Sequence, residues 1–210
     1  GVQGSGMHLH LSLFKDNTNA FYSADDPHHL SPIAKSFMAG LLHHAGEITA
    51  ITNQYVNSYK RLVPGFEAPV HVSWARNNRS GLIRVPIPKR GNPNATRIEY
   101  RSPDPACNPY LAFSVLLAAG MKGIREGYTL PAEADANLFR MNDAELAKLG
   151  VTQLPQSLSD ALKLMEKSEL VVEALGEHIV DWFLRNKRRE WMEYKTQVTP
   201  YELNRYLRSL

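Results

Sequence analysis

The sequence contains little of what several protein classes require. Its 210 residues include a single cysteine, Cys107, which excludes a framework of internal disulfides and indicates a reducing compartment. The longest apolar runs, such as residues 110–121, are too short to cross a membrane and contain small or polar residues. Internal repeats, low-complexity tracts and glycine-rich phosphate loops of the Walker or Rossmann kind are also absent. What remains is an ordinary globular composition, with 43% hydrophobic and 21% charged residues.

The beginning of the sequence gives a further expectation. It opens on Gly1 instead of methionine, and no basic and apolar leader follows. We therefore expect the 210 residues to be a piece of a longer chain.

Positive charge is concentrated in one segment. The net charge of the chain is +3, but residues 60–101 contain nine cations and two anions and so carry +7, which leaves −4 for the rest. The cations are Lys60, Arg61, Arg76, Arg79, Arg84, Lys89, Arg90, Arg97 and Arg101. Such a concentration predicts an anionic partner, whether nucleic acid, phosphate, carboxylate or acidic residues elsewhere.

Apolar periodicity predicts short strands in the first half of the chain. Residues 5–14 alternate strictly, with His8, His10 and Ser12 on one face of the expected strand. Three further alternating segments predict strands, and a loop rich in proline and glycine separates the last two. The strands are expected at residues 69–74, 81–86 and 96–101, and the loop at residues 86–94.

Helices are expected around and after these strands. Ser31 and Pro32 predict the start of a long helix that ends near Ile51, and a largely buried helix follows Asn108 and ends at Gly127. Later helices should begin after capping residues at Asn142, Ser157, Ser168 and Thr199. The fold class predicted is α+β, with antiparallel active-site strands, packed helices and a helical C-terminal region.

The first group that could carry chemistry is His8, His10 and Ser12. Residues two apart on a strand point the same way, about 7 Å apart, so these side chains should line one surface. Neutral imidazole is a common ligand of divalent metals. The polar outer face of a half-buried strand would give the same pattern.

The second group is Arg97, Glu99 and Arg101 on one face of a strand. An exposed ladder of charges could look the same, but further arginines (Arg61, Arg76, Arg79 and Arg84) precede it. Two like charges about 7 Å apart repel by roughly 2 kcal/mol at an effective dielectric of ~20. A folded cluster of arginines therefore favours a bound carboxylate or phosphate, and Glu99 could hold a hard cation such as Mg²⁺.

The third feature is a loop bounded by Pro64 and Pro69. It carries Glu67, which could act as a general base opposite a basic surface, although a solvated loop glutamate is the simpler interpretation. Cys107 and the pairs His28-His29 and His43-His44 are interpreted as structural, and residues 185–189 as a solvated helix face.

Together these motifs resemble the glutamine synthetase family of the bacterial type. The resemblance rests on three motifs and a closing segment, and it covers essentially residues 1–210. The segments are residues 4–12 (GSGMHLHLS), 57–65 (NSYKRLVPG), 97–111 (RIEYRSPDPACNPYL) and 193–207 (EYKTQVTPYELNRYL). It implies that the chain is the C-terminal part of the catalytic domain, with the N-terminal domain and the upstream catalytic strands outside it.

The resemblance also implies roles for particular residues. Metal ligands would be His8 and Glu99, for Mg²⁺ or Mn²⁺. Nucleotide contacts would come from His10, Ser12, Arg79, Arg84 and Arg97. Substrate contacts would come from Gln3, Gly4, Arg61, Glu67 and Arg101. Glu67, which would take a proton from ammonium, and Arg79, which would meet the transferring phosphate, would be the catalytic pair.

The activity implied is that of an ATP-dependent glutamate–ammonia ligase, which makes glutamine through γ-glutamyl phosphate in nitrogen metabolism. Its partners would be glutamate, ammonia and ATP, in a cytoplasmic homo-oligomer that is a dodecamer in the full-length family. Nucleic acid is not expected, because the basic segment contains glutamates and lacks interleaved aromatic residues. No membrane is expected either, because the apolar runs are too short to span one. With only two metal ligands, the 210-residue piece alone is predicted to be inactive and to bind metal weakly.

Two alternatives stay open. Gln3 stands where the family usually has asparagine, which admits a γ-glutamyl-amine or polyamine ligase of the same superfamily. A non-catalytic structural homologue is the other alternative, although the motif residues are intact. Residues 127–153 do not resemble the tyrosine-bearing loop that some bacterial members adenylylate, so we expect no such regulation.

Overall fold

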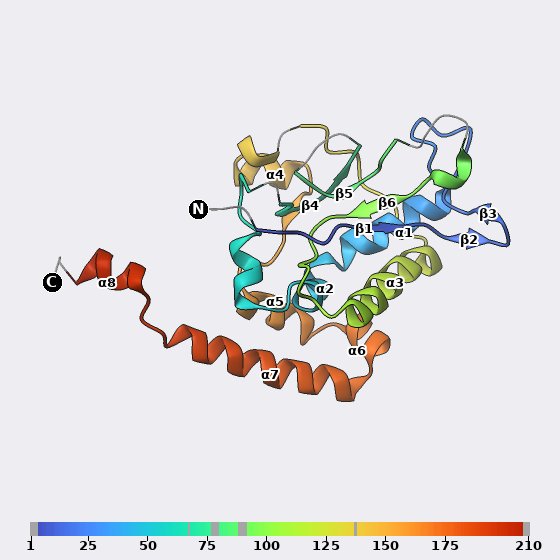
Figure 1. Ribbon diagram of the computed structural model, residues 1–210. Coiled ribbons are helices and arrows are strands. Elements are labelled where there is room, and N and C mark those ends of the chain that lie inside the picture. The colour runs from blue at the N-terminus through green and yellow to red at the C-terminus, as the bar shows by residue number, and fades with distance from the viewer. Residues whose placement is uncertain (1–3, 67, 77–79, 88–91, 137, 208–210) are drawn as a thin grey trace.

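The computed structural model describes residues 4–66, 68–76, 80–87, 92–136 and 138–207 (Figure 1). Within them a sheet runs in the order β1-β6-β5-β4-β7, and a two-stranded hairpin stands apart from it. The sheet strands are β1 (Leu9–Leu11), β4 (His71–Ala75), β5 (Gly81–Arg84), β6 (Ile98–Tyr100) and β7 (Thr152–Gln153). The hairpin consists of β2 (Phe14–Lys15) and β3 (Thr18–Asn19). This order places β6, which lies near the end of the basic segment of residues 60–101, between β1 and β5.

The sheet is mixed. β6 pairs antiparallel with both β1 and β5, as expected. β4 also pairs antiparallel with β7, a strand that the sequence did not predict. β4 and β5, however, run parallel, with an irregularity in register between His71 and Trp74, so the antiparallel expectation is wrong for this pair. Alternation of apolar and polar residues along a strand indicates which face is buried, but it does not indicate the direction of the neighbouring strand. The pattern therefore could not distinguish parallel from antiparallel pairing. The α+β class is confirmed.

The single long helix expected between Ser31 and Ile51 is divided into two helices. Ser31 caps α1 (Pro32–His43), and its hydroxyl accepts the N–H of Ala34, as the sequence predicts. At His44 the backbone leaves helical geometry and α2 (Ala45–Thr52) starts a new axis. No proline stands here, and the nearest glycine, Gly46, lies within α2, so the apolar pattern runs through the break unchanged.

α3 (Pro109–Glu126) packs closely on α1. Asn108 caps its first turn, and Gly127 ends it with a positive φ of 65°, which confirms both predicted ends. A Cβ on Gly123 would lie 2.2 Å from the carbonyl oxygen of Ser36, so the two backbones nearly touch. α3 is less buried than the largely buried helix expected, because a stripe of large apolar side chains faces outward. The stripe consists of Tyr110, Phe113 and Leu117.

The C-terminal region is helical, and its capping residues are those expected. The helices are α4 (Asp143–Lys148), α5 (Leu158–Met165), α6 (Glu169–Leu175), α7 (Glu177–Lys195) and α8 (Pro200–Tyr206). Asn142, Ser157, Ser168 and Thr199 cap α4, α5, α6 and α8 through their side chains. α7 runs along α5 and α6, and α8 extends away from the body of the protein (Figure 1).

The main hydrophobic core lies between the sheet and helices α1, α2, α3 and α5. Its largest fully buried side chains include Tyr100 of β6, Phe37 of α1 and Leu116 of α3. Short 3₁₀ turns connect these elements, at η1 (Val56–Lys60), η2 (Pro93–Ala95) and η3 (Leu138–Arg140). Among the described helices, none has the length and apolar character needed to span a bilayer. The core thus fixes β6 between β1 and β5, which bring their polar side chains to it from both sides.

Candidate active site

The predicted alternation of the first strand is confirmed. Met7, Leu9, Leu11 and Leu13 are half-buried, and the residues between them are exposed. Strand geometry itself covers only Leu9–Leu11, with His8 just before it. In the pairing with β6, His10 lies opposite Glu99. Since directly opposed residues share a face of the sheet, the histidines of β1 are brought to the acidic residue of β6.

Glu99 is the centre of the site. It is 3% exposed, and its Oε1 lies 2.7 Å from Nδ1 of His8. Its Oε2 accepts a hydrogen bond from Nε of Arg84, which lies opposite Glu99 on β5. Burial alone would raise the pKa of Glu99, but the hydrogen bond and charge of Arg84, with the charge of Arg101, hold that pKa below its ordinary value. Glu99 is therefore ionised at neutral pH.

His8 is the neutral partner in this contact. Burial, followed by the nearby charge of Arg101, lowers the pKa of His8, and these effects outweigh the opposing influence of Glu99. A neutral imidazole that donates its Nδ1–H to the Glu99 carboxylate keeps a lone pair on Nε2. This arrangement is the one that orients a histidine for a metal ion.

A metal ion fits His8 better than it fits Glu99. Both oxygens of Glu99 already contact protein groups, one the His8 imidazole and one the Arg84 guanidinium. Within the described ranges, no three residues among His, Cys, Asp and Glu are grouped closely enough to hold a metal. Glu99 could become a ligand if Arg84 moved, so these residues supply at most two ligands of a metal site.

Arg97 and His10 form the exposed end of the site. Nε of Arg97 donates to Nδ1 of His10 at 3.2 Å, and its Nη1 donates to the carbonyl oxygen of Ala95 at 3.3 Å. Ser12 is exposed beyond them on the same side of the strand. These groups offer a guanidinium and a hydroxyl to solvent, which suits contacts to an anion.

Arg61 lies deeper and bonds to the backbone. Its Nη1 donates to the carbonyl oxygen of Ser102 at 2.7 Å and its Nη2 to that of Arg101 at 3.1 Å. Two glycines make room for it, because a Cβ on Gly6 would lie 2.1 Å from its Nη2 and one on Gly4 would lie 3.2 Å from its Cβ. In this structure Arg61 joins η1 to the segment after β6, and its substrate role stays a prediction.

Arg101 is also buried and connects two strands. Its Nη1 donates to the carbonyl oxygen of Gly81 at 3.2 Å, at the start of β5. Its charge influences both His8 and Glu99, as their pKa directions indicate. Arg101 thus stabilises the anionic and neutral states found at the centre of the site.

The structure brings together most of the described residues expected at the site. His8, Arg84, Glu99 and Arg101 lie at its centre, with Arg97 and His10 at its edge. Gln3, Glu67 and Arg79 lie outside the described residues. Arg76 does not join the cluster, because its guanidinium contacts His28 and its backbone N–H binds Glu133. Sequence reasoning did not single out Glu133, and no spacing signal connects it to Arg76.

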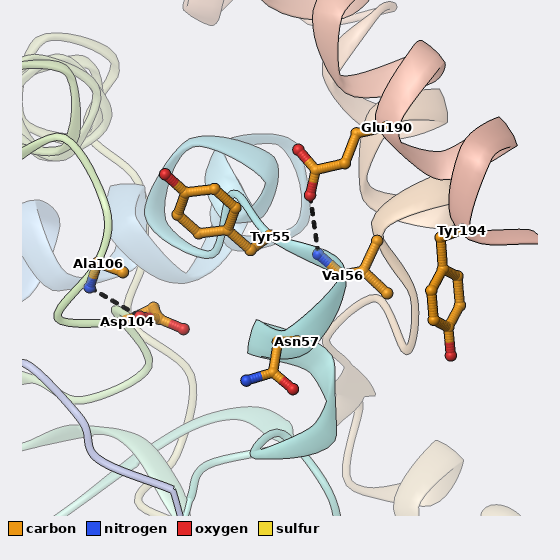
Figure 2. Close-up of a pocket in the computed structure, with 7 residues that line it drawn as sticks. All are labelled: Tyr55, Val56, Asn57, Asp104, Ala106, Glu190 and Tyr194. Atoms are coloured by element: carbon orange, nitrogen blue, oxygen red, sulfur yellow. Dashed lines mark hydrogen bonds between the residues drawn. The ribbon is translucent and has the colours of Figure 1, made fainter. Parts of the chain in front are cut away.

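A cavity of about 450 Å³ lies elsewhere, between η1, the segment after β6 and the end of α7 (Figure 2). Glu190 of α7 accepts the N–H of Val56 at 3.4 Å, and Asp104 accepts that of Ala106 at 2.8 Å. Tyr55 and Tyr194 contribute aromatic surface to its lining. Both carboxylates are engaged by the chain's own backbone: the Glu190 bond joins α7 to η1, and the Asp104 bond is local to the segment after β6.

Comparisons with known proteins agree on one family. A family model described as "Glutamine synthetase, catalytic domain" matches residues 1–206. A protein named glutamine synthetase from Mycolicibacterium smegmatis is 57% identical over 204 residues, which cover 97% of this chain and 46% of that protein. The one from Methanosarcina mazei is 52% identical over 210 residues, covering 100% of this chain and 46% of the relative. This chain therefore spans about half the length of the curated relatives it matches.

Solved structures give the same result for the fold. The structure titled "Apo GmaS without ligand" superposes with a TM-score of 0.82 at 36% identity, over 97% of this chain and 45% of that one. The structure titled "GmaS/ADP complex-Conformation 1" gives a TM-score of 0.84 at 36% identity, over 97% and 46% of the two chains.

Proposed function

The chain belongs to the glutamine synthetase family, and from that premise we propose that it is the C-terminal part of the catalytic domain of an ATP-dependent glutamate–ammonia ligase. In this reaction the γ-carboxylate of glutamate attacks the terminal phosphorus of ATP, which gives γ-glutamyl phosphate and ADP. Ammonia then attacks the acyl carbon, and inorganic phosphate leaves as glutamine forms.

The observation that carries the proposal is the position of Glu99 between His8 and Arg84. Phosphoryl transfer has little covalent chemistry for a protein to do, and it depends on positioned positive charge. Glu99 of β6 holds the guanidinium of Arg84 from the neighbouring strand β5. Arg97 and Arg101 stand on either side of Glu99 in the sequence, at the two ends of β6. The arginines would neutralise the phosphates of ATP and the carboxylate of glutamate.

Mg²⁺ or Mn²⁺ is the proposed cofactor. His8 would bind the metal ion through Nε2 while Glu99 orients the imidazole, and Glu99 itself would join when Arg84 turns to a phosphate. The metal supplies charge neutralisation at the phosphate oxygens. Because the described residues offer two ligands, other parts of the site must provide the remaining ones.

The other proposed roles follow the family motifs. His10, Ser12, Arg79, Arg84 and Arg97 would contact the nucleotide. Gln3, Gly4, Arg61 and Arg101 would contact the amino acid. Glu67 would accept a proton from ammonium, and Arg79 would stabilise the transferring phosphate. The buried position of Arg61, with its guanidinium on backbone carbonyls, supports a second role for it in shaping the amino-acid pocket.

The test is an assay of the complete enzyme that carries this chain. Glutamine and ADP should form in equal amounts, and only when glutamate, ammonia, ATP and Mg²⁺ or Mn²⁺ are all present. Glu99→Gln should lower kcat by at least about a hundredfold, whereas the exposed control Asp160→Asn on α5 should not change it. ADP formation without glutamate, or full activity in Glu99→Gln, would contradict the proposal.

A γ-glutamyl-amine ligase is the second candidate. The observation for it is Gln3, which stands where the family usually has asparagine. The same enzyme preparation should therefore be offered ammonia, methylamine and putrescine in parallel. A higher kcat/KM for either amine than for ammonia would favour this candidate. Loss of all three activities in a folded enzyme would favour a non-catalytic homologue.

Assembly and location are proposed on the same basis. Exposed apolar side chains gather at the C-terminal end, on and before α8, and they support a homo-oligomer, with a dodecamer as the proposed state. They are Val198, Tyr201, Leu203, Tyr206 and Leu207. The cytoplasm is the proposed location, because ATP is available there and these 210 residues contain one cysteine, Cys107.

A further inference from the structure

Arg76, the residue that follows β4, is held from two sides. Its backbone N–H donates to Oε1 of Glu133 at 2.7 Å, and its Nη1 lies 3.4 Å from Nδ1 of His28. The remaining oxygen of Glu133 lies 3.7 Å from Nε2 of His28. The three side chains come from the loop before α1, the end of β4 and the segment after α3, so they connect parts of the chain that are far apart in sequence.

The segment that carries Glu133 is itself fixed to β4. The carbonyl oxygen of Pro131 accepts the indole N–H of Trp74 at 2.8 Å, and the N–H of Ala134 donates to the carbonyl oxygen of Trp74 at 3.0 Å. The ring of His28 meets the indole of Trp74 edge-on, with centroids 5.5 Å apart. Glu133 is therefore presented to Arg76 from a segment with little freedom to move.

The loop that carries His28 is equally constrained. Oδ1 of Asp26 accepts the backbone N–H groups of His28 and Leu30, both at 3.0 Å. Its other oxygen forms an ion pair with Lys35 of α1. These bonds lower the pKa of Asp26 despite the opposing effect of burial, so the carboxylate that shapes this loop is ionised at neutral pH.

A short path leads from this group to the centre of the active site. Ala75, the residue before Arg76, lies opposite Arg84 in the sheet, and its carbonyl oxygen accepts the N–H of Val85 at 3.1 Å. Arg84 in turn donates to Glu99. The parallel pairing of β4 with β5 is irregular between His71 and Trp74, so the pairs that hold Arg84 against β4 are confined to the last two residues of β4.

We propose that Glu133 and His28 are positioning residues for the active site. They fix the end of β4 through Arg76, and the fixed end supports the pairing of Ala75 with Arg84 and so helps to hold Arg84 at Glu99. The consequence for catalysis rests on the proposed function, whereas the constraint on β4 does not. A solvated ion pair at the same place would contribute little to stability. Here, however, the Glu133 carboxylate accepts the backbone N–H of Arg76, next to the pairing of Ala75 with Arg84.

The test compares Glu133→Ala with Glu133→Gln in the complete enzyme. The amide oxygen of glutamine can still accept the N–H of Arg76, so this variant should resemble the wild type. Glu133→Ala should speed hydrogen exchange at the Arg76 and Val85 amides by about tenfold. It should also lower kcat and Mn²⁺ affinity by at least about tenfold, the range typical of residues that support a metal site.

Glu145→Ala is the matched control, because it also removes a carboxylate that accepts a backbone N–H, that of Asn142 at 2.8 Å. It should leave kcat and the exchange of the two amides unchanged. Unchanged exchange in Glu133→Ala, or equal losses in both Glu133 variants, would overturn the proposal. If the wild type makes no γ-glutamyl product, the proposed function fails, while the exchange rates still decide whether Glu133 holds β4.

Discussion

The carboxylate of Glu99 lies 2.7 Å from Nδ1 of His8, and this contact joins β6 to the segment that leads into β1. One partner is ionised and the other is neutral, since the pKa of each is lowered. His8 therefore has a free lone pair on Nε2 while its Nδ1–H is hydrogen-bonded to a carboxylate, as is common in metal-binding histidines.

The first prediction concerns metal affinity. Glu99→Gln removes the charge that orients His8 and should weaken Mn²⁺ binding by about 10–100-fold. Isothermal titration calorimetry of the complete enzyme measures the affinity, with Asp160→Asn as the control. The 210-residue chain on its own should bind Mn²⁺ more weakly than the complete enzyme, because its described residues provide two ligands. Equal affinities for the chain and the enzyme would show that further ligands lie within these 210 residues.

The second prediction concerns acid stability through Glu99. Its folded pKa lies below the ordinary value of 4.5, chiefly because Arg84 outweighs the effect of burial. The ionised carboxylate thus contributes stability that is present above about pH 4.5 and is lost as the pH falls through the folded pKa. Urea unfolding of the wild type and of Glu99→Gln, compared between pH 7 and pH 3, should show the difference in unfolding free energy shrinking below pH 4.5. A difference that stays constant over this range would contradict the prediction.

The third prediction concerns His71 of β4, which is 3% exposed and packs against Phe139. Burial lowers the pKa of His71 below 6.5, so the unfolded chain takes up a proton at a higher pH than the folded chain does. The unfolding free energy should therefore fall as the pH drops below 6.5. In His71→Leu this slope between pH 6.5 and 5 should decrease, while the slope below pH 4.5, where Glu99 titrates, should persist. Urea denaturation at closely spaced pH values measures both.

The fourth prediction compares two glycines beside Arg61. An added Cβ at Gly6 would lie 2.1 Å from Nη2 of Arg61, whereas one at Gly4 would lie 3.2 Å from its Cβ. Gly6→Ala should displace the guanidinium from the carbonyl oxygens of Arg101 and Ser102 and cost about 1–3 kcal/mol of stability. It should also raise KM for glutamate, if Arg61 shapes that pocket. Gly4→Ala should cost less stability than Gly6→Ala, and the reverse order would contradict this account.

Features of the fold that depend on residues close together in the sequence could be predicted, and features that depend on distant residues could not. Helix starts at Asn142, Ser157, Ser168 and Thr199 are confirmed, because a cap is decided by residues within three positions of each other. The break at His44 was missed, since no local residue type marks it.

The site was predictable residue by residue but not as an arrangement. The alternation that placed His8 on a polar face is confirmed, and the family motifs marked His8 and Glu99 as metal ligands. Their direct contact depends on the register of β1 against β6, which periodicity does not specify. Glu133 was missed for the same reason, because its partner Arg76 is far away in sequence and meets it only in the folded chain.

The last prediction concerns the contact between α1 and α3. Replacing a helical glycine with alanine normally adds about 1 kcal/mol of stability, because the backbone of glycine has more freedom to lose. At Gly123 the sign should reverse, since a Cβ would lie 2.2 Å from the carbonyl oxygen of Ser36 and 2.7 Å from Cα of Gly40. Both neighbours are backbone atoms, so the helices must separate.

Gly46 of α2 supplies the matched control, because the Cβ added there would meet only the end of the Leu164 side chain, at 3.1 Å. Thermal unfolding should therefore show a lower Tm for Gly123→Ala, by several degrees for each kcal/mol lost. Gly46→Ala should match or exceed the wild type. A Gly123→Ala variant as stable as the wild type would mean that α1 and α3 are not packed as closely as described. The position of the sheet that packs against these helices would then need revision.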